Sequence, residues 1–337
     1  MQLATARLGH MVAQPWALRR SRISAALFCL TLIALSACSR EAPSTGQALL
    51  WIQPMRDHPV HRLMQAGFLA RCRELAIQCD VVGNPSATAF DIAATLPLAD
   101  AALARRNYDA IMVYAVDPAL NPYVSRLARD GVPVMIVHLL PQQGDIPGLK
   151  AAIGQDVKQT AAAAAISMGN RLGGNGEVAV TQGSYNRTEN EMAQVFASTL
   201  TERFPGIKVL PPQLEGFEPT TAKTKVVAIL QSNERITGAF STTGAGAETW
   251  ANANRAAGRA VTIIAMCATR QNLDLIKAGA VYAVAAQPLY EESVAAVDVG
   301  LKLARGEQVE FHNILPTEIV TAPDLAPYYA LLDKAGQ

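Results

Sequence analysis

Hydrophobic and polar positions follow two alternating patterns from residue 48 onward. Short, almost continuously apolar runs rich in Val, Ile and Ala are typical of strands buried on both faces of a parallel sheet. Between them lie longer stretches with apolar residues at helical spacing. The expected strands are 48–53, 79–83, 109–115, 132–138, 151–154, 177–182, 207–211, 236–242, 261–267, 281–287 and 313–322. The expected helices include 60–75, 88–106, 156–172, 188–203, 220–232, 245–257, 270–278 and 289–305.

This many strands exceeds what one small doubly wound domain holds, so the pattern predicts an α/β fold of two doubly wound, Rossmann-like domains. We expect an N-terminal lobe of residues 48–153 plus 288–313 and a C-terminal lobe of residues 154–287 plus 314–337. The chain then crosses three times between the lobes, which makes a hinge. A hinge between two open sheets places a cleft at the carboxyl ends of their strands.

The first 37 residues have the composition of an export signal. Arg19, Arg20 and Arg22 precede an uncharged run of 15 residues, 23–37, which is short for a bilayer span and suits the apolar core of a signal peptide. The run ends in "LSAC", which resembles the lipobox of bacterial lipoproteins and implies that Cys38 is lipidated. An ordinary signal with a chance cysteine is the alternative. The small polar residues of 38–47 are expected to form a tether.

Charge and the other cysteines narrow the class of protein. The chain has 29 basic and 28 acidic residues, and because residues 1–37 hold four Arg and no acid, 25 basic and 28 acidic residues remain beyond them. No basic surface for nucleic acid is indicated. Cys72, late in a predicted helix, and Cys79, at the start of the next strand, either form a disulfide or remain free thiols. No sequence motif of a known catalytic site is present, so no enzyme is predicted.

Several segments, taken in order, resemble the type I periplasmic binding proteins of the ribose- and galactose-binding family. They include the His-Pro turn after the first strand, "NYDAIMVYAVDP", "DGVPVMIVH", "GEVAVTQGSYNRTENEMAQVF" and "LIKAGAVYAVAAQP". The resemblance covers residues 48 to about 322. It implies a periplasmic receptor, a lipid-anchored monomer without a cofactor, that delivers a carbohydrate-like or other small polar solute to an ABC permease. The same fold could instead report occupancy to a membrane kinase or chemoreceptor.

The resemblance also assigns the ligand contacts. His58 and His61 replace an asparagine and an aromatic residue of sugar-binding relatives, and His138 replaces the aspartate of an Asp-Arg pair. Asn190, Thr243 and Cys267 stand where relatives carry an arginine, an asparagine and an aspartate. The predicted ligand-binding residues are His58, His61, Tyr114, His138, Asn190, Phe217, Thr243, Cys267 and Gln287. Because most charged sugar clamps are absent, a less hydroxylated or partly aromatic solute is also compatible with the sequence.

The histidines leave other interpretations open. His58, His61 and His138 with Cys267 offer the ligand types of a zinc site, although H-x-x-H spacing alone is a weak signal. Any one of these histidines could simply cap a helix or face solvent. If they contact the solute, affinity is expected to fall at mildly acidic pH, where imidazole gains a proton.

Overall fold

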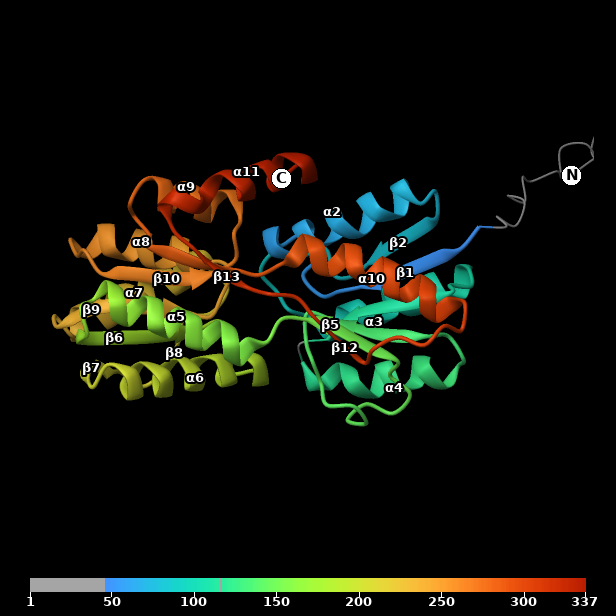
Figure 1. Ribbon diagram of the computed structural model, residues 1–337, viewed down its shortest axis with the longest axis horizontal. Helices are drawn as coiled ribbons and strands as arrows, with labels where there is room; N and C mark the ends of the chain where they lie inside the picture. Colours follow the sequence, from blue (N-terminus) through green and yellow to red (C-terminus); the bar gives the residue numbers. More distant parts are fainter. Residues whose placement is uncertain (1–45, 116) are drawn as a thin grey trace, which may run out of the picture. The chain divides into compact units, whose positions relative to one another are not determined.

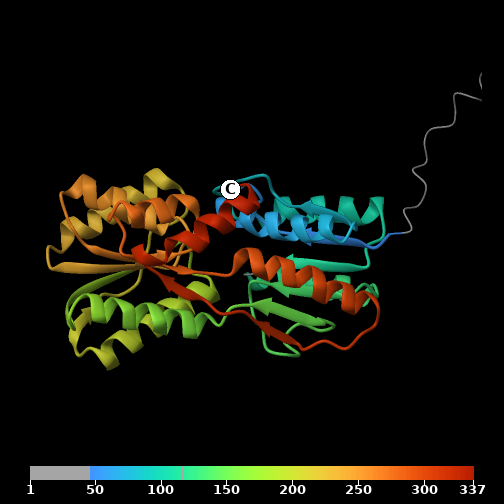
Figure 2. The same cartoon turned by 45° about the horizontal axis from the view of Figure 1, so that its top comes forward.

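The computed structural model describes residues 46–115 and 117–337 (Figure 1). The predicted signal peptide, Cys38 and most of the predicted tether lie outside the described residues. Residues 46–337 form one compact unit that contains two open sheets, each covered by helices on both faces (Figures 1 and 2). The predicted α/β fold with two doubly wound domains is therefore confirmed. Within the described residues, no helix combines the length and the apolar character needed to cross a bilayer.

The sheet of the first lobe is parallel throughout, with strand order β12-β5-β4-β3-β1-β2. Alternate residues of a strand point to opposite faces, so Leu49 and Trp51 pack toward α2 and α10 while Leu50 and Ile52 pack toward α3 and α4. The strands are β1 (Ala48–Ile52), β2 (Gln78–Val82), β3 (Ala110–Tyr114), β4 (Val134–Val137), β5 (Ala151–Gly154) and β12 (His312–Ile314). The helices are α2 (Pro59–Glu74), α3 (Ile92–Arg105), η1 (Pro118–Leu120), α4 (Asn121–Arg129) and α10 (Leu289–Ala304).

The sheet of the second lobe has the order β13-β11-β10-β9-β6-β7, with β8 paired to β6 and β13 antiparallel to β11. Helices α5 and α6 pack against each other, as do α7 and α8. The strands are β6 (Asn175–Gln182), β7 (Gly206–Val209), β8 (Gln213–Leu214), β9 (Ile236–Ser241), β10 (Thr262–Met266), β11 (Ala283–Ala286) and β13 (Glu318–Val320). The helices are α5 (Val157–Arg171), α6 (Arg187–Arg203), α7 (Pro219–Ser232), α8 (Gly246–Ala257), α9 (Arg270–Lys277), η2 (Ala322–Asp324) and α11 (Leu325–Ala335).

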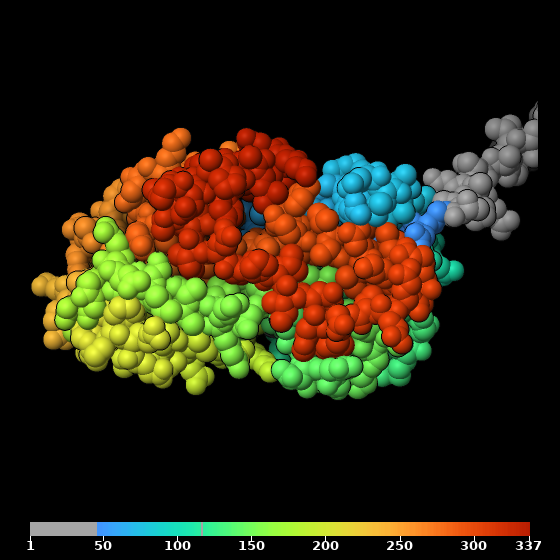
Figure 3. Space-filling model, in the orientation of Figure 1, coloured from blue at the N-terminus to red at the C-terminus, as the bar shows by residue number. Residues whose placement is uncertain are grey.

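The chain passes between the two sheets three times, at 155–156, 287–288 and 315–317. The first and third crossovers are tied together, because the Thr317 hydroxyl donates to Gln155 Oε1 and Leu315 N donates to Gly154 O at 2.9 Å. The C-terminal segments, orange to red in Figure 3, cover much of one face over both lobes. The two linked crossovers and the third crossover together form the hinge.

Several elements differ from the sequence-based expectation, and the short strand β8 and the turns η1 and η2 are among those it did not include. The expected strand 313–322 is two strands, β12 in one sheet and β13 in the other. Pro316 lies between them, and because proline has no N–H it cannot continue a ladder. Helices α4 and α11 were not predicted. Helix α4 has only nine residues, so its apolar periodicity spans little more than two turns.

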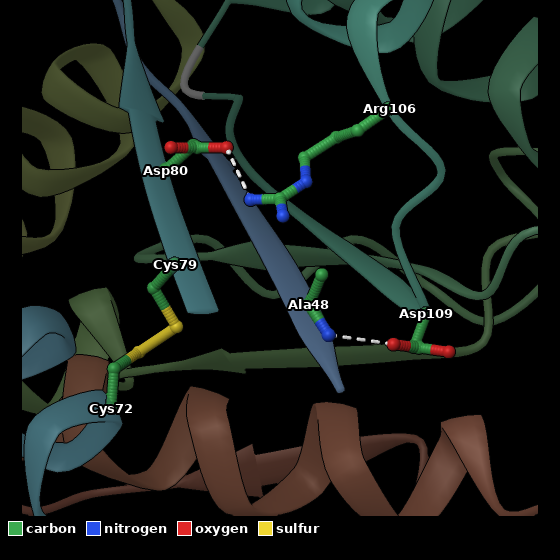
Figure 4. The surroundings of a disulfide bond; sticks show 6 residues. All are labelled: Ala48, Cys72, Cys79, Asp80, Arg106 and Asp109. Atoms are coloured by element: carbon green, nitrogen blue, oxygen red, sulfur yellow. Dashed lines mark hydrogen bonds and ion pairs between the residues drawn. A yellow bond between two sulfur atoms is a disulfide. The ribbon is translucent and has the colours of Figure 1, made fainter. Parts of the chain in front are cut away.

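Cys72, near the end of α2, and Cys79, in β2, are joined as a disulfide with Cα atoms 6.2 Å apart (Figure 4). The bond fastens the last turn of the helix to an edge strand of the first sheet. Near it, the start of β1 is held by Asp109, which accepts from Ala48 N at 2.6 Å. The amino-terminal edge of the first lobe is thus cross-linked both covalently and by hydrogen bonds.

Candidate functional site

A cleft lies between the lobes at the carboxyl ends of both sets of strands, and residues of both lobes line it. Its volume is about 130 Å³, which lies below the range of roughly 300–1,000 Å³ given for drug-sized ligands and therefore indicates a small solute. Eight of the nine predicted contact residues line the cleft: His58, His61, Tyr114, His138, Phe217, Thr243, Cys267 and Gln287.

The turn after β1 and the first turn of α2 present two histidines in defined tautomers. His58 is the N-cap of α2, and its Nδ1 accepts from Val60 N at 3.3 Å. His61 is buried, and its Nδ1 lies 2.9 Å from the carbonyl oxygen of Met55, so this nitrogen must donate. Burial lowers the pKa of His58 to about 4 and that of His61 to about 3. Both rings are therefore neutral at pH 7, with Nε2 protonated in His58 and a bare acceptor in His61.

These pKa values correct one expectation. Protonation of His58 or His61 does not reach the mildly acidic range, because desolvation of the charged ring opposes it down to about pH 4 and about pH 3. The two rings therefore give no reason for solute affinity to fall between pH 5 and pH 8.

Four rings form a row along the wall of the first lobe. The ring centroids of His58 and His61 are 5.6 Å apart, those of His61 and Tyr114 4.5 Å, and those of Tyr114 and His138 5.4 Å. The last pair is stacked, with 19° between the planes. Burial raises the pKa of the Tyr114 hydroxyl, so that it stays a proton donor. This wall combines aromatic faces with a few oriented polar atoms, which is the usual composition of a small-molecule site.

A chain of hydrogen bonds joins the two lobes beside the hinge. Glu292, fully buried on α10, lies 2.9 Å from Nδ1 of His138. The other ring nitrogen of His138 is 3.1 Å from Nε2 of Gln287, and Oε1 of Gln287 accepts from the Cys267 thiol at 2.8 Å. Burial raises the pKa of that thiol, which keeps it a donor. Each group can therefore donate to the next: the thiol to the amide oxygen, the amide nitrogen to the imidazole, and the imidazole to the carboxylate.

His138 and Cys267 occupy equivalent places in the two lobes. Each directly follows a central strand, β4 or β10, and each has a left-handed backbone, with φ of 78° and 69°. Residues with a Cβ adopt this conformation at a cost of about 1–3 kcal/mol, and such residues concentrate at functional sites.

The wall of the second lobe is built on two buried carboxylates. Glu189, on the first turn of α6, accepts from Gly183 N and from the Thr242 hydroxyl, both at 2.6 Å. Glu215, which is 1% exposed, accepts from the hydroxyls of Ser241 at 2.7 Å and Thr243 at 2.9 Å. Burial raises the pKa of both carboxyl groups, and the donated hydrogen bonds oppose that rise.

Asn190 does not line the cleft. Its side chain is exposed, and its Oδ1 accepts from Nε2 of Gln182 at 2.8 Å. Asn186 caps α6, and the residue three positions later, Glu189, turns toward the cleft. Asn190, the next residue, points elsewhere because successive side chains of a helix are rotated by about 100° around its axis. The predicted residue, Asn190, is thus one position away from Glu189, which lines the cleft.

The sequence-based prediction also missed Asp117, Ser184, Asn186 and Thr242, which line the cleft from loops that follow strands. Asp117 had a recognisable signal, since it precedes Pro118 directly after a buried strand and caps the short helix η1. Among residues 46–115 and 117–337 no group of three or more His, Cys, Asp or Glu side chains is placed to hold a metal ion.

The comparisons with known proteins agree with this geometry. Residues 50–308 match the family model described as a periplasmic binding protein domain. A putative rhizopine-binding protein of Rhizobium meliloti is 25% identical over 227 residues, which cover 65% of this chain and 74% of that protein.

Solved structures resemble the fold closely. A glucose-galactose binding protein from Geobacillus stearothermophilus has a TM-score of 0.76 at 18% identity, covering 84% of this chain and 100% of that chain. An ABC transporter solute-binding protein from Agrobacterium vitis, bound with α-D-tagatopyranose, has a TM-score of 0.75 at 21% identity, covering 83% and 96%. The family model spans most of the chain, and both lobes and the cleft are present. The chain therefore belongs to the periplasmic binding protein family and is an extracytoplasmic solute-binding protein, not an enzyme.

Proposed function

We propose that the chain is the receptor of an ABC importer and binds a small hydroxylated solute, carbohydrate-like in size and polarity, in the cleft between its lobes. The observation that carries the proposal is the cleft itself, lined from both lobes by aromatic rings and oriented polar groups. Its volume of about 130 Å³ limits the solute to a small molecule. The solved structure with α-D-tagatopyranose supports this class of solute.

A solute in this place acts on the hinge. His61 and Tyr114 would contact it from the first lobe, and Phe217 and Thr243 from the second. Since both sets of contacts are available only when the lobes are together, binding shifts the open–closed equilibrium toward the closed form. Gln287 lies in a crossover, so the solute also meets the hinge directly.

The location and partners follow from the closed form. A monomer anchored through lipidated Cys38 would present its closed lobes to an ABC permease in the inner membrane. The permease would distinguish the closed form from the open one by the distance between surfaces on the two lobes. Transport rather than sensing is proposed, and a permease that binds the solute-loaded receptor more tightly than the empty one would support it.

The test is a thermal-shift screen of residues 40–337, which contain the whole compact unit 46–337. The panel holds sugars, polyols, nucleosides, aromatic acids and divalent metal salts, each with and without EDTA. A solute at ~100 times its dissociation constant should stabilise the protein by ~2.7 kcal/mol. We expect stabilisation by hydroxylated solutes. Stabilisation by Zn²⁺ alone, abolished by EDTA, would contradict the proposal.

A matched pair of variants locates the binding. Phe217→Ala removes an aromatic face from the cleft and should weaken affinity for the solute at least tenfold. Tyr185→Ala is the control, because Tyr185 is 65% exposed and is absent from the cleft lining. Equal weakening by both substitutions would place the solute outside the cleft.

A further inference from the structure

Acidic side chains surround the cleft, and within the described residues no Lys or Arg lines it. Of the side chains that line it, Asp117 and Glu189 are carboxylates. Glu215 and Glu292 lie buried behind the lining, the first hydrogen-bonded to Thr243 and the second to His138. A cleft with low-dielectric walls and charges of one sign concentrates solutes of the opposite sign.

The hydroxyl groups of the second lobe strengthen this bias. The Thr242 hydroxyl donates a hydrogen bond to Glu189 at 2.6 Å, and the Thr243 hydroxyl donates one to Glu215 at 2.9 Å. A hydroxyl has one proton and two lone pairs, so both threonines keep only lone pairs for a solute. The two buried carboxyl groups thus leave Thr242 and Thr243 as acceptors, while Thr188, the other threonine of the lining, has a hydroxyl that is unpartnered among the described residues and can donate.

The first lobe adds further acceptors. Nδ1 of His61 donates to Met55 O at 2.9 Å, which leaves Nε2 as an acceptor in the neutral ring. Asp117 Oδ1 accepts from Ala119 N at 2.8 Å, and within the described part of the chain no group donates to its Oδ2. Against these stand two donors of the same lobe, the Nε2–H of His58 and the Tyr114 hydroxyl.

Aromatic faces complete the surroundings. Phe90, Tyr114 and Phe217 line the cleft, and the face of an aromatic ring attracts a cation within about 6 Å of its centre. The attraction grows when water is excluded, as it is between closed lobes.

We propose, building on the receptor function proposed above, that the solute carries a protonated amino group on a hydroxylated ring or chain, as an amino sugar or amino polyol does. An ammonium group has three donors and no acceptor, which is the complement of the Thr242, Thr243, His61 and Asp117 acceptors. A neutral polyol brings an acceptor with each hydroxyl, and only a few of these find a donor in the cleft. The His58 and Tyr114 donors serve the hydroxyl groups of the amine-bearing solute.

The test compares solutes that differ only at the amine. Isothermal titration of residues 40–337 is carried out with D-glucosamine and D-galactosamine, with their N-acetyl forms and with D-glucose and D-galactose. An open-chain pair, 1-amino-1-deoxy-D-glucitol and D-glucitol, is added. At least one amine should bind ten times more tightly than both its neutral parent and its N-acetyl form. That advantage should shrink as salt is raised, because it is electrostatic.

Variants identify the groups responsible. Asp117→Asn should reduce the preference for the amine at least fivefold, and because asparagine also caps helices the turn at η1 is retained. Asp91→Asn is the matched control, since Asp91 caps α3 through Ala94 N and does not line the cleft. Glu189→Gln removes the second charge and should also lower the preference.

Each outcome decides the proposal. Equal or tighter binding of a neutral parent overturns the amine while leaving the receptor function intact. An amine preference that survives both Asp117→Asn and Glu189→Gln overturns the assignment of the charged groups. If no amine, no neutral sugar and no member of the wider thermal-shift panel binds, the receptor function itself fails.

Discussion

Replacing His61 with asparagine should flatten the dependence of stability on pH. The asparagine side chain keeps an N–H near the position of Nδ1, which donates to Met55 O, but it has no proton site in this range. In the native protein, burial lowers the pKa of His61 from 6.5 to about 3. The unfolded chain therefore binds a proton below about pH 6.5 that the folded chain refuses until about pH 3.

The sign and size follow from linkage. Because the unfolded state binds more protons than the folded state in this range, the free energy of unfolding falls as the pH falls. A pH of 5 lies about 1.5 units below the pKa of His61 in the unfolded chain and well above its pKa in the folded chain. At 1.36 kcal/mol for each unit, His61 therefore lowers the free energy of unfolding at pH 5 by about 2 kcal/mol. His61 is 4% exposed, so solvent screening takes away little of this amount.

The assay is urea unfolding of residues 40–337 at pH 7 and pH 5, followed by the fluorescence of Trp51 and Trp250, which are fully buried in the two lobes. Between pH 7 and pH 5, the free energy of unfolding of His61→Asn should fall by about 2 kcal/mol less than that of the unsubstituted protein. Leu63→Ala on the same helix removes packing without removing a proton site and should keep the original pH dependence. An unchanged pH dependence in His61→Asn would refute the buried neutral imidazole.

Two further predictions concern the disulfide and the closure of the lobes. A reducing agent should lower the free energy of unfolding by about 2–3 kcal/mol, because it removes the loop constraint of a disulfide with a sequence separation of 7. It should have no effect on a Cys72→Ala/Cys79→Ala variant. An equal effect on both proteins would contradict a stabilising role of the disulfide. Gly244→Ala places a methyl group 2.6 Å from Cγ2 of Val60 across the cleft, so it should weaken solute affinity at least tenfold in titration calorimetry. Adding Val60→Ala should restore most of the affinity, and a failure to restore it would show that the methyl group acts elsewhere.

The strands could be predicted because each fills the interior of a sheet covered on both faces. Trp51 and Phe240, for example, are fully buried on β1 and β9, and a strand buried on both sides must be apolar at nearly every position. The expected strand 313–322 was wrong for the opposite reason. Its two halves are short edge strands with exposed residues such as Ile314, 58% exposed, and edge strands carry little hydrophobic signal.

The positions of the site were predictable to a similar extent. Parallel strands bring their carboxyl ends together, so His138 and Cys267, which end β4 and β10, had to face one cleft. Asn190 was misplaced because it lies on a helix, where an error of one residue turns a side chain by about 100°. In the loop before that helix the residue that matters, Asn186, acts by capping, and the cap sets which later residue faces the cleft.

The chemistry of the site could not be predicted from residue types, because it depends on where protons point. In the sequence, the loss of the acidic and basic sugar clamps at His138, Asn190 and Cys267 suggests a less polar cleft. In the structure the carboxyl groups of Glu189, in the lining, and of Glu215, behind it, accept hydrogen bonds from the hydroxyls of Thr242 and Thr243. Acidic groups are therefore still present around the cleft, and they set the direction of the hydrogen bonds that Thr242 and Thr243 offer to a solute. The proposed amine would be selected by the hydrogen-bond donors that it supplies, and for that reason the amine, more than the hydroxyl pattern, is the property to test.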